Sequence, residues 1–176
     1  MRKYVAFLRG INIGRHHKVP MAELKSEFGK MGFKNISTIL NSGNVLFEAN
    51  EIVSEDEISN QLESVFGFSI PTLIREFESL VKIYNGHPFE NADVTKDIRL
   101  YVSFLKNEVN TQFTLPWKSE DGSFQILKEV DKSVLSLLDL TKSSTPKAME
   151  ALEKHYGKDI TTRNWNTIER IIKKGW

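Results

Sequence analysis

The first twenty residues place a buried strand, a polar loop and the start of a helix in direct succession. Tyr4–Leu8 is an unbroken apolar run, which is typical of a central strand covered on both faces. The following loop, Arg9–Lys18, is polar and contains Gly10 and Gly14. Pro20 suits the first turn of a helix, because its missing N–H would have no intrahelical partner there. This stretch favours a sheet with helices packed against it.

The next residues extend this order to strand-helix-strand-strand-helix-strand. The elements predicted after the first strand are a helix from Pro20 to Gly32, strands at 36–40 and 45–48, a helix between Ser54 and Gly67, and a strand at 69–74. Asn41–Asn44 forms the tight turn between the two middle strands. The predicted fold class is therefore α+β, with a ferredoxin-like (split β-α-β) N-terminal half.

The second half repeats part of this order. Its predicted elements are a short helix at 77–84, a strand at 98–105, an irregular stretch at 107–122, a hairpin of 123–130 with 134–138, and helices at 147–156 and from Trp165 to about Lys174. We expect a ferredoxin-like α+β subdomain at 1–86, a linker at 87–97, and a second, smaller α+β subdomain at 98–176. The order of elements suggests that this second subdomain is a degenerate repeat of the first.

Composition narrows the class of protein. The chain has 176 residues and no cysteine, so disulfides, thiolate catalysis and cysteine-metal sites are excluded, and a cytoplasmic location fits. No apolar run reaches about 18 residues, so we expect no membrane partner. The apolar run after Lys3 is too short for the core of a signal peptide.

Charge is unevenly distributed along the chain. The net charge is +1, but residues 1–34 carry +6, residues 35–141 carry −9 and residues 142–176 carry +4. This pattern can arise from solvated helix faces alone. It also fits two basic ends that meet and bind an anion.

The loop after the first strand is the strongest site motif. Arg9, Gly10, Asn12, Gly14 and Lys18 lie between the end of a strand and the start of a helix. A loop there can present backbone N–H groups and the positive end of a helix dipole to an anion, and an arginine can add a bidentate contact. The glycine pattern matches neither a dinucleotide fingerprint nor a P-loop, and glycines in turns alone would explain it.

Two further polar motifs stand at the ends of predicted elements. Ser42, Gly43 and Asn44 belong to the predicted turn, whose side chains also satisfy their own backbone. Thr162, Arg163, Asn164 and Trp165 precede the last helix, where Thr162 or Asn164 can act as the N-cap. The second arginine at a helix start again suits an anion, although a surface arginine beside a core tryptophan is an equally good interpretation.

The two adjacent histidines carry no clear chemistry. Neighbouring side chains diverge, so His16 and His17 are a poor chelating pair, and no acidic residue lies close in sequence. A serine nucleophile at Ser42 would need a base and an orienting group that the sequence does not identify. We expect no metal site and no cofactor, and catalytic residues stay unknown.

Motifs far apart in the chain together resemble a known family. They are Val5–Gly14 with Lys18 and Met21-x-x-Leu24, then Gly32-Phe33 and Ser42–Val45, and finally Thr161–Thr167. In this order and spacing they resemble the bacterial family of domain of unknown function 1697. The chain departs from the family pattern at Arg15 and Asn41, where glycine and glutamine are usual. The resemblance implies a cytoplasmic α+β protein with a ferredoxin-like N-terminal half, and it implies no assigned activity.

These observations lead to one main functional hypothesis. The Arg9–Lys18 loop, the Ser42–Asn44 turn and the Thr162–Trp165 helix start would converge on a pocket for a small anionic or phosphorylated ligand. Arg9 and Arg163 would pair with the anion, and Trp165 would wall the pocket. The residues expected to form hydrogen bonds with the ligand are Asn12, Ser42 and Asn44.

Two alternatives from other classes stay open. The basic ends could bind nucleic acid, and that affinity would fall steeply with salt. Alternatively, the motifs are only turns and caps, and function lies in a protein-interaction surface with no small-molecule site. The sequence leaves open whether the chain is an enzyme and what its oligomeric state is.

Overall fold

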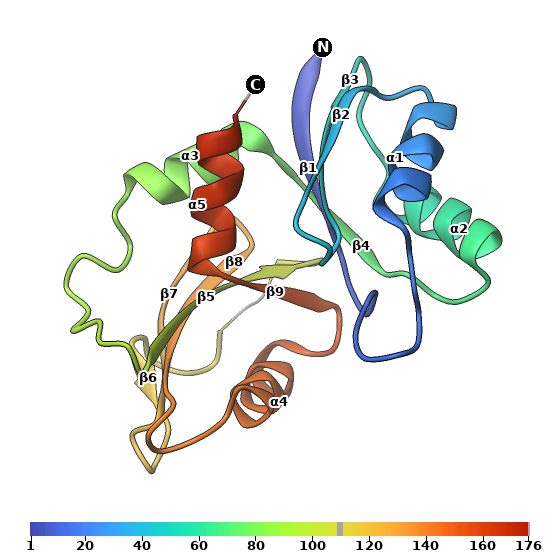
Figure 1. The fold of residues 1–176 in the computed structure, drawn as a ribbon. Helices are drawn as coiled ribbons and strands as arrows, with labels where there is room; N and C mark the ends of the chain where they lie inside the picture. The colour runs from blue at the N-terminus through green and yellow to red at the C-terminus, as the bar shows by residue number, and fades with distance from the viewer. Residues whose placement is uncertain (109–110, 176) are drawn as a thin grey trace. The chain divides into compact units, whose positions relative to one another are not determined.

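The computed structural model describes residues 1–108 and 111–175. This part of the chain is mixed α+β, with two antiparallel sheets and five helices (Figure 1). It divides into two compact units, Met1–Val81 and Lys82–Trp176, which we call unit 1 and unit 2. The division falls inside helix α3 (Phe77–Asn85), and the linker expected at 87–97 stays a prediction.

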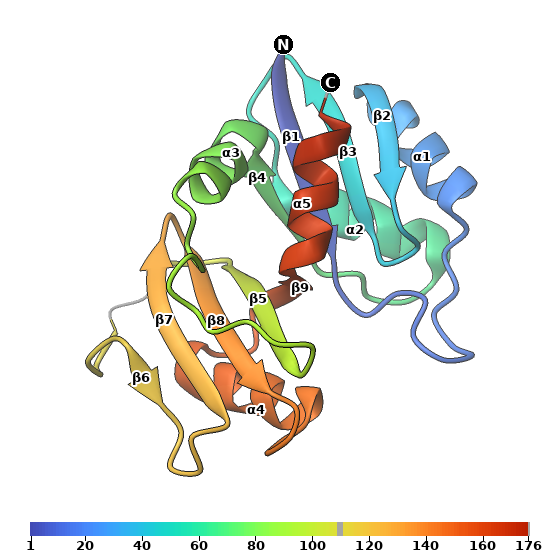
Figure 2. The same cartoon turned by 60° about the vertical axis from the view of Figure 1, so that its left-hand side comes forward.

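Unit 1 is built from six elements ahead of α3. They are β1 (Arg2–Leu8), α1 (Met21–Lys30), β2 (Lys34–Ile39), β3 (Asn44–Ala49), α2 (Glu55–Phe66) and β4 (Thr72–Glu76). The sheet order is β2-β3-β1-β4, and every neighbouring pair is antiparallel. Strand β3 therefore lies between β1 and β2, and α1 and α2 cover one face of the sheet (Figure 2).

Successive side chains of β1 point to opposite faces of the sheet, so the strand contributes to both faces. Tyr4, Ala6 and Leu8 pack into the core formed with α1 and α2, where Tyr4 stacks on Phe47 of β3 with ring centroids 5.6 Å apart. The intervening side chains of β1 lie on the opposite face of the sheet. All five residues from Tyr4 to Leu8 are buried, as expected for a central strand.

The ends of α2 follow from local sequence. Ser54 precedes the helix, and its Oγ accepts a hydrogen bond from the Glu57 N–H at 3.3 Å. Gly67 ends the helix with φ 77°, a conformation that costs glycine little. Both predicted helix ends are confirmed.

Strand β4 differs from the prediction of a strand at 69–74. It begins at Thr72, directly after Pro71, and continues to Glu76. It is an edge strand, and side chains of α2 satisfy its outward N–H groups: Ser59 Oγ accepts from Thr72 N at 3.1 Å and Glu55 Oε1 accepts from Ile74 N at 2.7 Å. These two N–H groups are thereby unavailable for pairing with another chain.

Unit 2 contains a second sheet and two further helices. Its elements are β5 (Ile98–Leu105), β6 (Trp117–Lys118), β7 (Phe124–Val130), β8 (Ser133–Asp139), α4 (Thr145–Tyr156), β9 (Ile160–Asn164) and α5 (Trp165–Lys174). The sheet order is β6-β7-β8-β5-β9, again antiparallel throughout. Helix α4 covers one face through Ala148, Leu152 and Tyr156 (Figure 2).

The predicted hairpin of unit 2 is confirmed. Asp131 and Lys132 join β7 to β8 with φ values of 47° and 56°, as a two-residue hairpin turn requires. The stretch predicted to be irregular at 107–122 contains the two-residue strand β6, and its residues 109–110 lie outside the described residues.

The motif at 161–164 precedes the last helix, as predicted, but the sequence did not predict that these residues form a strand. These residues belong to strand β9, which pairs with β5. The β-branched residues Thr161 and Thr162 favour a strand, and Thr162 Oγ1 lies 2.8 Å from Ser103 Oγ across the pair. The last helix begins immediately afterwards, at Trp165.

Candidate functional site

Backbone hydrogen bonds anchor the loop that follows β1. The Leu8 N–H donates to the Gly43 carbonyl at 2.8 Å, and the Arg9 N–H donates to the Pro71 carbonyl at 2.9 Å. The loop therefore starts beside the turn between β2 and β3. Two of the three predicted site motifs, the Arg9–Lys18 loop and the Ser42–Asn44 turn, are adjacent in unit 1.

Asn12 organises the loop internally. It has φ 55°, and its Nδ2 donates to the carbonyls of Val19 at 3.0 Å and Asn41 at 2.8 Å. Its Oδ1 accepts from the Val19 N–H at 2.9 Å. Both amide N–H bonds are thus used within the protein and hold the loop, and the predicted ligand contact of Asn12 stays a prediction.

Gly43 shows why the turn and the loop fit together. Its φ is 78°, and a Cβ at this position would lie 2.7 Å from Leu8 Cβ and 2.9 Å from Ile11 Cδ1. The neighbouring Asn44 is fully buried, and its Nδ2 donates to the Ile39 carbonyl at 2.9 Å and to Ser42 Oγ at 3.1 Å. The observed contacts of Gly43 and Asn44 are therefore structural ones.

An open hollow lies at the start of α1. It has a volume of about 370 Å³ and is lined by Asn12, Lys18, Val19, Pro20, Met21 and Asn41. We call it the α1 hollow. Pro20 precedes the helix, and its side chain makes no capping hydrogen bond. Backbone N–H groups of the first turn, which have no partner inside a helix, therefore lie beside the exposed Lys18.

The surroundings of the α1 hollow are basic. Arg15, His16, His17 and Lys18 are consecutive and exposed, and Lys18 is the charged residue among those that line the hollow. The ring of His17 stacks on Phe68, with centroids 4.3 Å apart and an angle of 16°. Glu23, in the first turn of α1, is the acidic residue that opposes this positive potential.

The remaining predicted site residues of the loop and the turn do not line the α1 hollow. Gly10 and Gly14 have φ values of 77° and 61°, so both serve the loop conformation. Arg9 is half-buried and does not line the α1 hollow, and Ser42 is exposed in its turn.

The third predicted motif belongs to unit 2. Arg163 Nη1 donates to Thr161 Oγ1 and to the Thr162 carbonyl, both at 3.0 Å, and burial lowers the pKa of Arg163 to about 10. The guanidinium is therefore still protonated at neutral pH. Because this motif and the other two lie in separate units, their convergence on one pocket stays a prediction.

Trp165 and Asn164 have local roles at the start of α5. The Trp165 ring stacks on Tyr84 with centroids 5.8 Å apart and meets the Phe89 ring edge-on at 5.2 Å. Asn164 is the residue before the helix, and its side chain makes no capping hydrogen bond. The expected N-cap interaction is therefore not formed, and Trp165 holds an aromatic cluster in unit 2.

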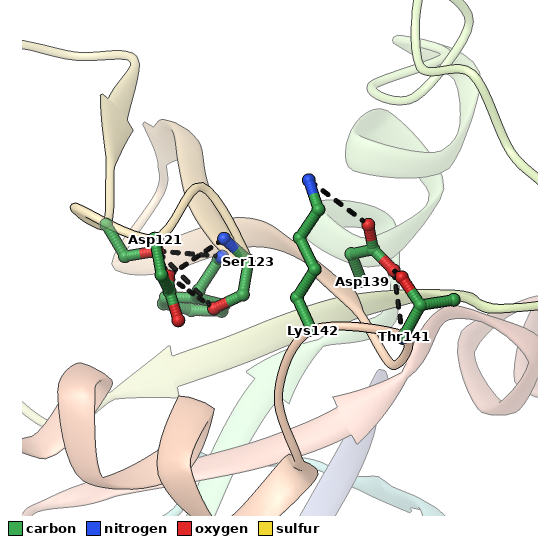
Figure 3. A network of polar contacts seen from close by, with 7 residues as sticks. Asp121, Ser123, Asp139, Thr141 and Lys142 are labelled. Carbon is green, nitrogen blue, oxygen red and sulfur yellow. Dashed lines mark hydrogen bonds and ion pairs between the residues drawn. The ribbon is translucent and has the colours of Figure 1, made fainter.

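Two aspartates of unit 2 that the sequence analysis did not single out form tight polar turns (Figure 3). Asp121 Oδ1 accepts from Ser119 Oγ at 2.7 Å and from Ser123 Oγ and N at 2.7 and 2.9 Å, and these bonds lower the pKa of Asp121 to about 2. Asp139 Oδ1 accepts from Thr141 Oγ1 at 2.6 Å, which lowers the pKa of Asp139. Each carboxylate closes its own turn.

A third polar group ties α4 to β7. Glu129 Oε1 accepts from Tyr156 Oη at 2.7 Å and from Thr111 Oγ1. Burial and this carboxylate raise the pKa of Tyr156 above its usual value. The adjacent His155 packs against Phe113 and Trp117, and its burial, with a contribution from Lys154, lowers the pKa of His155. These contacts partly bury the end of α4.

Two negative findings apply to the described residues. Within 1–108 and 111–175, no three His, Asp or Glu side chains are grouped so that they could hold a metal ion. In the same ranges, no helix combines the length and the apolar character needed to cross a bilayer.

The structure and the sequence both have relatives. A conserved bacterial protein from Streptococcus pneumoniae has a similar structure, with a TM-score of 0.66 and 20% sequence identity over 98% of this chain and 97% of that chain. No curated protein has a matching sequence. The model of a family described as a protein of unknown function (DUF1697) matches residues 1–134. This match covers most of the chain, which therefore belongs to the DUF1697 family.

Proposed function

We propose that the protein binds a small anionic ligand, such as a phosphate or carboxylate compound, in the α1 hollow. The observation that carries this proposal is an open hollow at the start of α1, lined by Lys18 and by Pro20, whose side chain does not cap the helix. The positive end of a helix and a lysine attract the same kind of ligand. The proposal keeps the substrate class predicted from the sequence and moves its centre from Arg9 to Lys18.

The loop supplies a preformed geometry for such a ligand. Asn12 links the loop at Val19 to the turn at Asn41, so Lys18 projects from a segment fixed on both sides. A preorganised segment loses little conformational entropy when a ligand binds. In this scheme Lys18 forms the ion pair, the first-turn N–H groups of α1 bind anion oxygens, and the Asn41 amide lies at the rim.

The sequence hypothesis adds a contribution from unit 2. We keep as part of the proposal that Arg163 pairs with the anion and that Thr162, Asn164 and Trp165 surround it. The protonated state of Arg163 supports this role, while its bonds to Thr161 and Thr162 offer a purely structural alternative. Arg163→Ala separates the two.

The test is a thermal-shift and calorimetric titration of the purified protein. The probes are inorganic phosphate, a nucleoside monophosphate, citrate and short DNA and RNA oligomers, each at low and high salt. A probe at a hundred times its dissociation constant stabilises the fold by about 2.7 kcal/mol. We expect Lys18→Ala to abolish the shift and Lys25→Ala, an exposed lysine of α1 outside the hollow, to preserve it.

The other outcomes of the titration distinguish between modes of binding. Equal losses in Lys18→Ala and Lys25→Ala would show non-specific attraction and contradict the α1 hollow. Shifts with oligomers alone, lost at high salt, would favour nucleic acid. A loss in Arg163→Ala as well as in Lys18→Ala would support the shared pocket, and a loss in Lys18→Ala alone would confine the site to unit 1.

We also propose that unit 1 is ferredoxin-like and that unit 2 is its degenerate repeat. The strand order β2-β3-β1-β4 of unit 1 corresponds to β7-β8-β5-β9 of unit 2, and a helix follows the last strand in each case. The described residues between β5 and β7 contain β6 instead of a helix equivalent to α1. The absence of cysteine and the bacterial structural relative support a cytoplasmic, bacterial protein.

A further inference from the structure

A second and larger hollow in unit 1 is not used by the proposed function. It has a volume of about 510 Å³ and lies where the end of α1 meets the loop before α2. Residues that line it include Met31, Phe33, Glu51, Ile52, Val53 and Glu57. We call it the α1–α2 hollow. It shares no lining residue with the α1 hollow.

The floor of the α1–α2 hollow is apolar. Met31, Phe33 and Val53 are partly buried and pack on the core of unit 1. Ile52 stands at the rim with 87% of its surface exposed, the largest exposed fraction among the large hydrophobic residues described. A single exposed isoleucine is ordinary, but one that borders an apolar hollow enlarges a continuous apolar surface.

The charges at the rim have one sign. Glu51 and Glu57 are both exposed, and no lysine or arginine is among the residues that line the hollow. The Glu57 backbone is held by Ser54 Oγ, which fixes where this carboxylate leaves the helix. The charged side chains that line this hollow are therefore acidic, whereas the one that lines the α1 hollow is basic.

We propose that the α1–α2 hollow is a docking site for a basic peptide segment of a partner protein. An apolar side chain of the segment enters the hollow against Phe33 and Ile52, and flanking Lys or Arg side chains pair with Glu51 and Glu57. An apolar hollow with two exposed carboxylates at its rim matches a segment that combines an apolar side chain with basic flanking side chains. This inference does not depend on the anion site.

The primary test is an NMR titration of the full-length ¹⁵N-labelled protein. The probe is the acetylated and amidated peptide Lys-Arg-Leu-Leu-Arg-Lys. Two control peptides replace either the leucines by serine or the basic residues by glutamate. We expect saturable shift changes in the amides of residues 31–33 and 50–58 with the probe alone. Equal changes with the serine peptide, or changes mapped elsewhere, would overturn the proposal.

Variants identify the side chains responsible. Ile52→Ser is expected to weaken binding by about tenfold, because the contact of one buried isoleucine is lost. Ile13→Ser is the matched control, since Ile13 is 72% exposed and lies outside the hollow. Unchanged affinity in Ile52→Ser would contradict the proposal.

The charge contribution is tested in the same way. The double variant Glu51→Gln/Glu57→Gln is expected to weaken binding and to flatten its salt dependence. Glu63→Gln, an exposed residue of α2 outside the hollow, should bind as the wild type does. Lys18→Ala should also bind the peptide normally, which separates this site from the α1 hollow. Concentration-dependent shifts at these same amides without peptide would identify a second copy of the chain as the occupant and overturn the proposal.

Discussion

At the scale of single residues, Gly43 joins two motifs that are far apart in sequence. The absence of a side chain lets the turn approach Leu8 and Ile11 closely, and its positive φ suits glycine. We expect Gly43→Ala to lower the free energy of unfolding by about 2–4 kcal/mol, because backbone strain and overpacking add. Urea denaturation measures this effect.

Gly14 provides the matched control for Gly43. Its φ is 61°, but a Cβ there would meet nothing within 4 Å. Gly14→Ala should therefore cost about 1 kcal/mol, from backbone strain alone. Equal decreases in the free energy of unfolding for the two variants would show that close packing at Gly43 does not contribute to stability.

At the scale of elements, α2 protects the edge of the sheet in unit 1. Ser59 and Glu55 accept hydrogen bonds from the backbone of β4 at Thr72 and Ile74. Ser59→Ala leaves the partly buried Thr72 N–H without its acceptor, so we expect a loss of about 1 kcal/mol in the free energy of unfolding. Ser64→Ala, at an exposed position of α2, should be neutral or slightly stabilising, because alanine has the higher helix propensity. A stabilising Ser59→Ala would mean that solvent replaces the side chain at this edge.

At the scale of the whole molecule, the linker predicted at 87–97 is the feature to test. Residues 93–96 are exposed, and β5 starts only at Ile98. Inserting six Gly-Ser residues after Val94 should change the free energy of unfolding by less than about 0.5 kcal/mol, because lengthening a flexible connection costs little entropy. The same insertion between Asp131 and Lys132 should destabilise far more, since it breaks a two-residue hairpin turn. Loss of folded protein after the first insertion would show that 87–97 is not a linker.

Much of the local structure could be predicted from local signals. The apolar run at Tyr4–Leu8, the cap at Ser54 and the terminating Gly67 each act through neighbours in sequence, and each lies where it was expected. The family followed from motifs whose order and spacing are themselves sequence properties. The charge pattern likewise indicated an anion as the ligand class, which stays a prediction.

Other features depended on partners distant in the chain. The segment at 161–164 is a strand because β5 offers it a hydrogen-bonding edge, a fact absent from its own residues. Asn12 links the loop to the turn because its amide reaches Asn41, 29 positions away. The α1–α2 hollow exists because the end of α1 meets the loop before α2. Sequence alone thus determined most of the elements and the mixed α+β class of the fold, through short-range propensity and capping. Tertiary structure decided which polar side chains form hydrogen bonds within the protein and where hollows lie on its surface. Both depend on contacts between residues that are far apart in the chain.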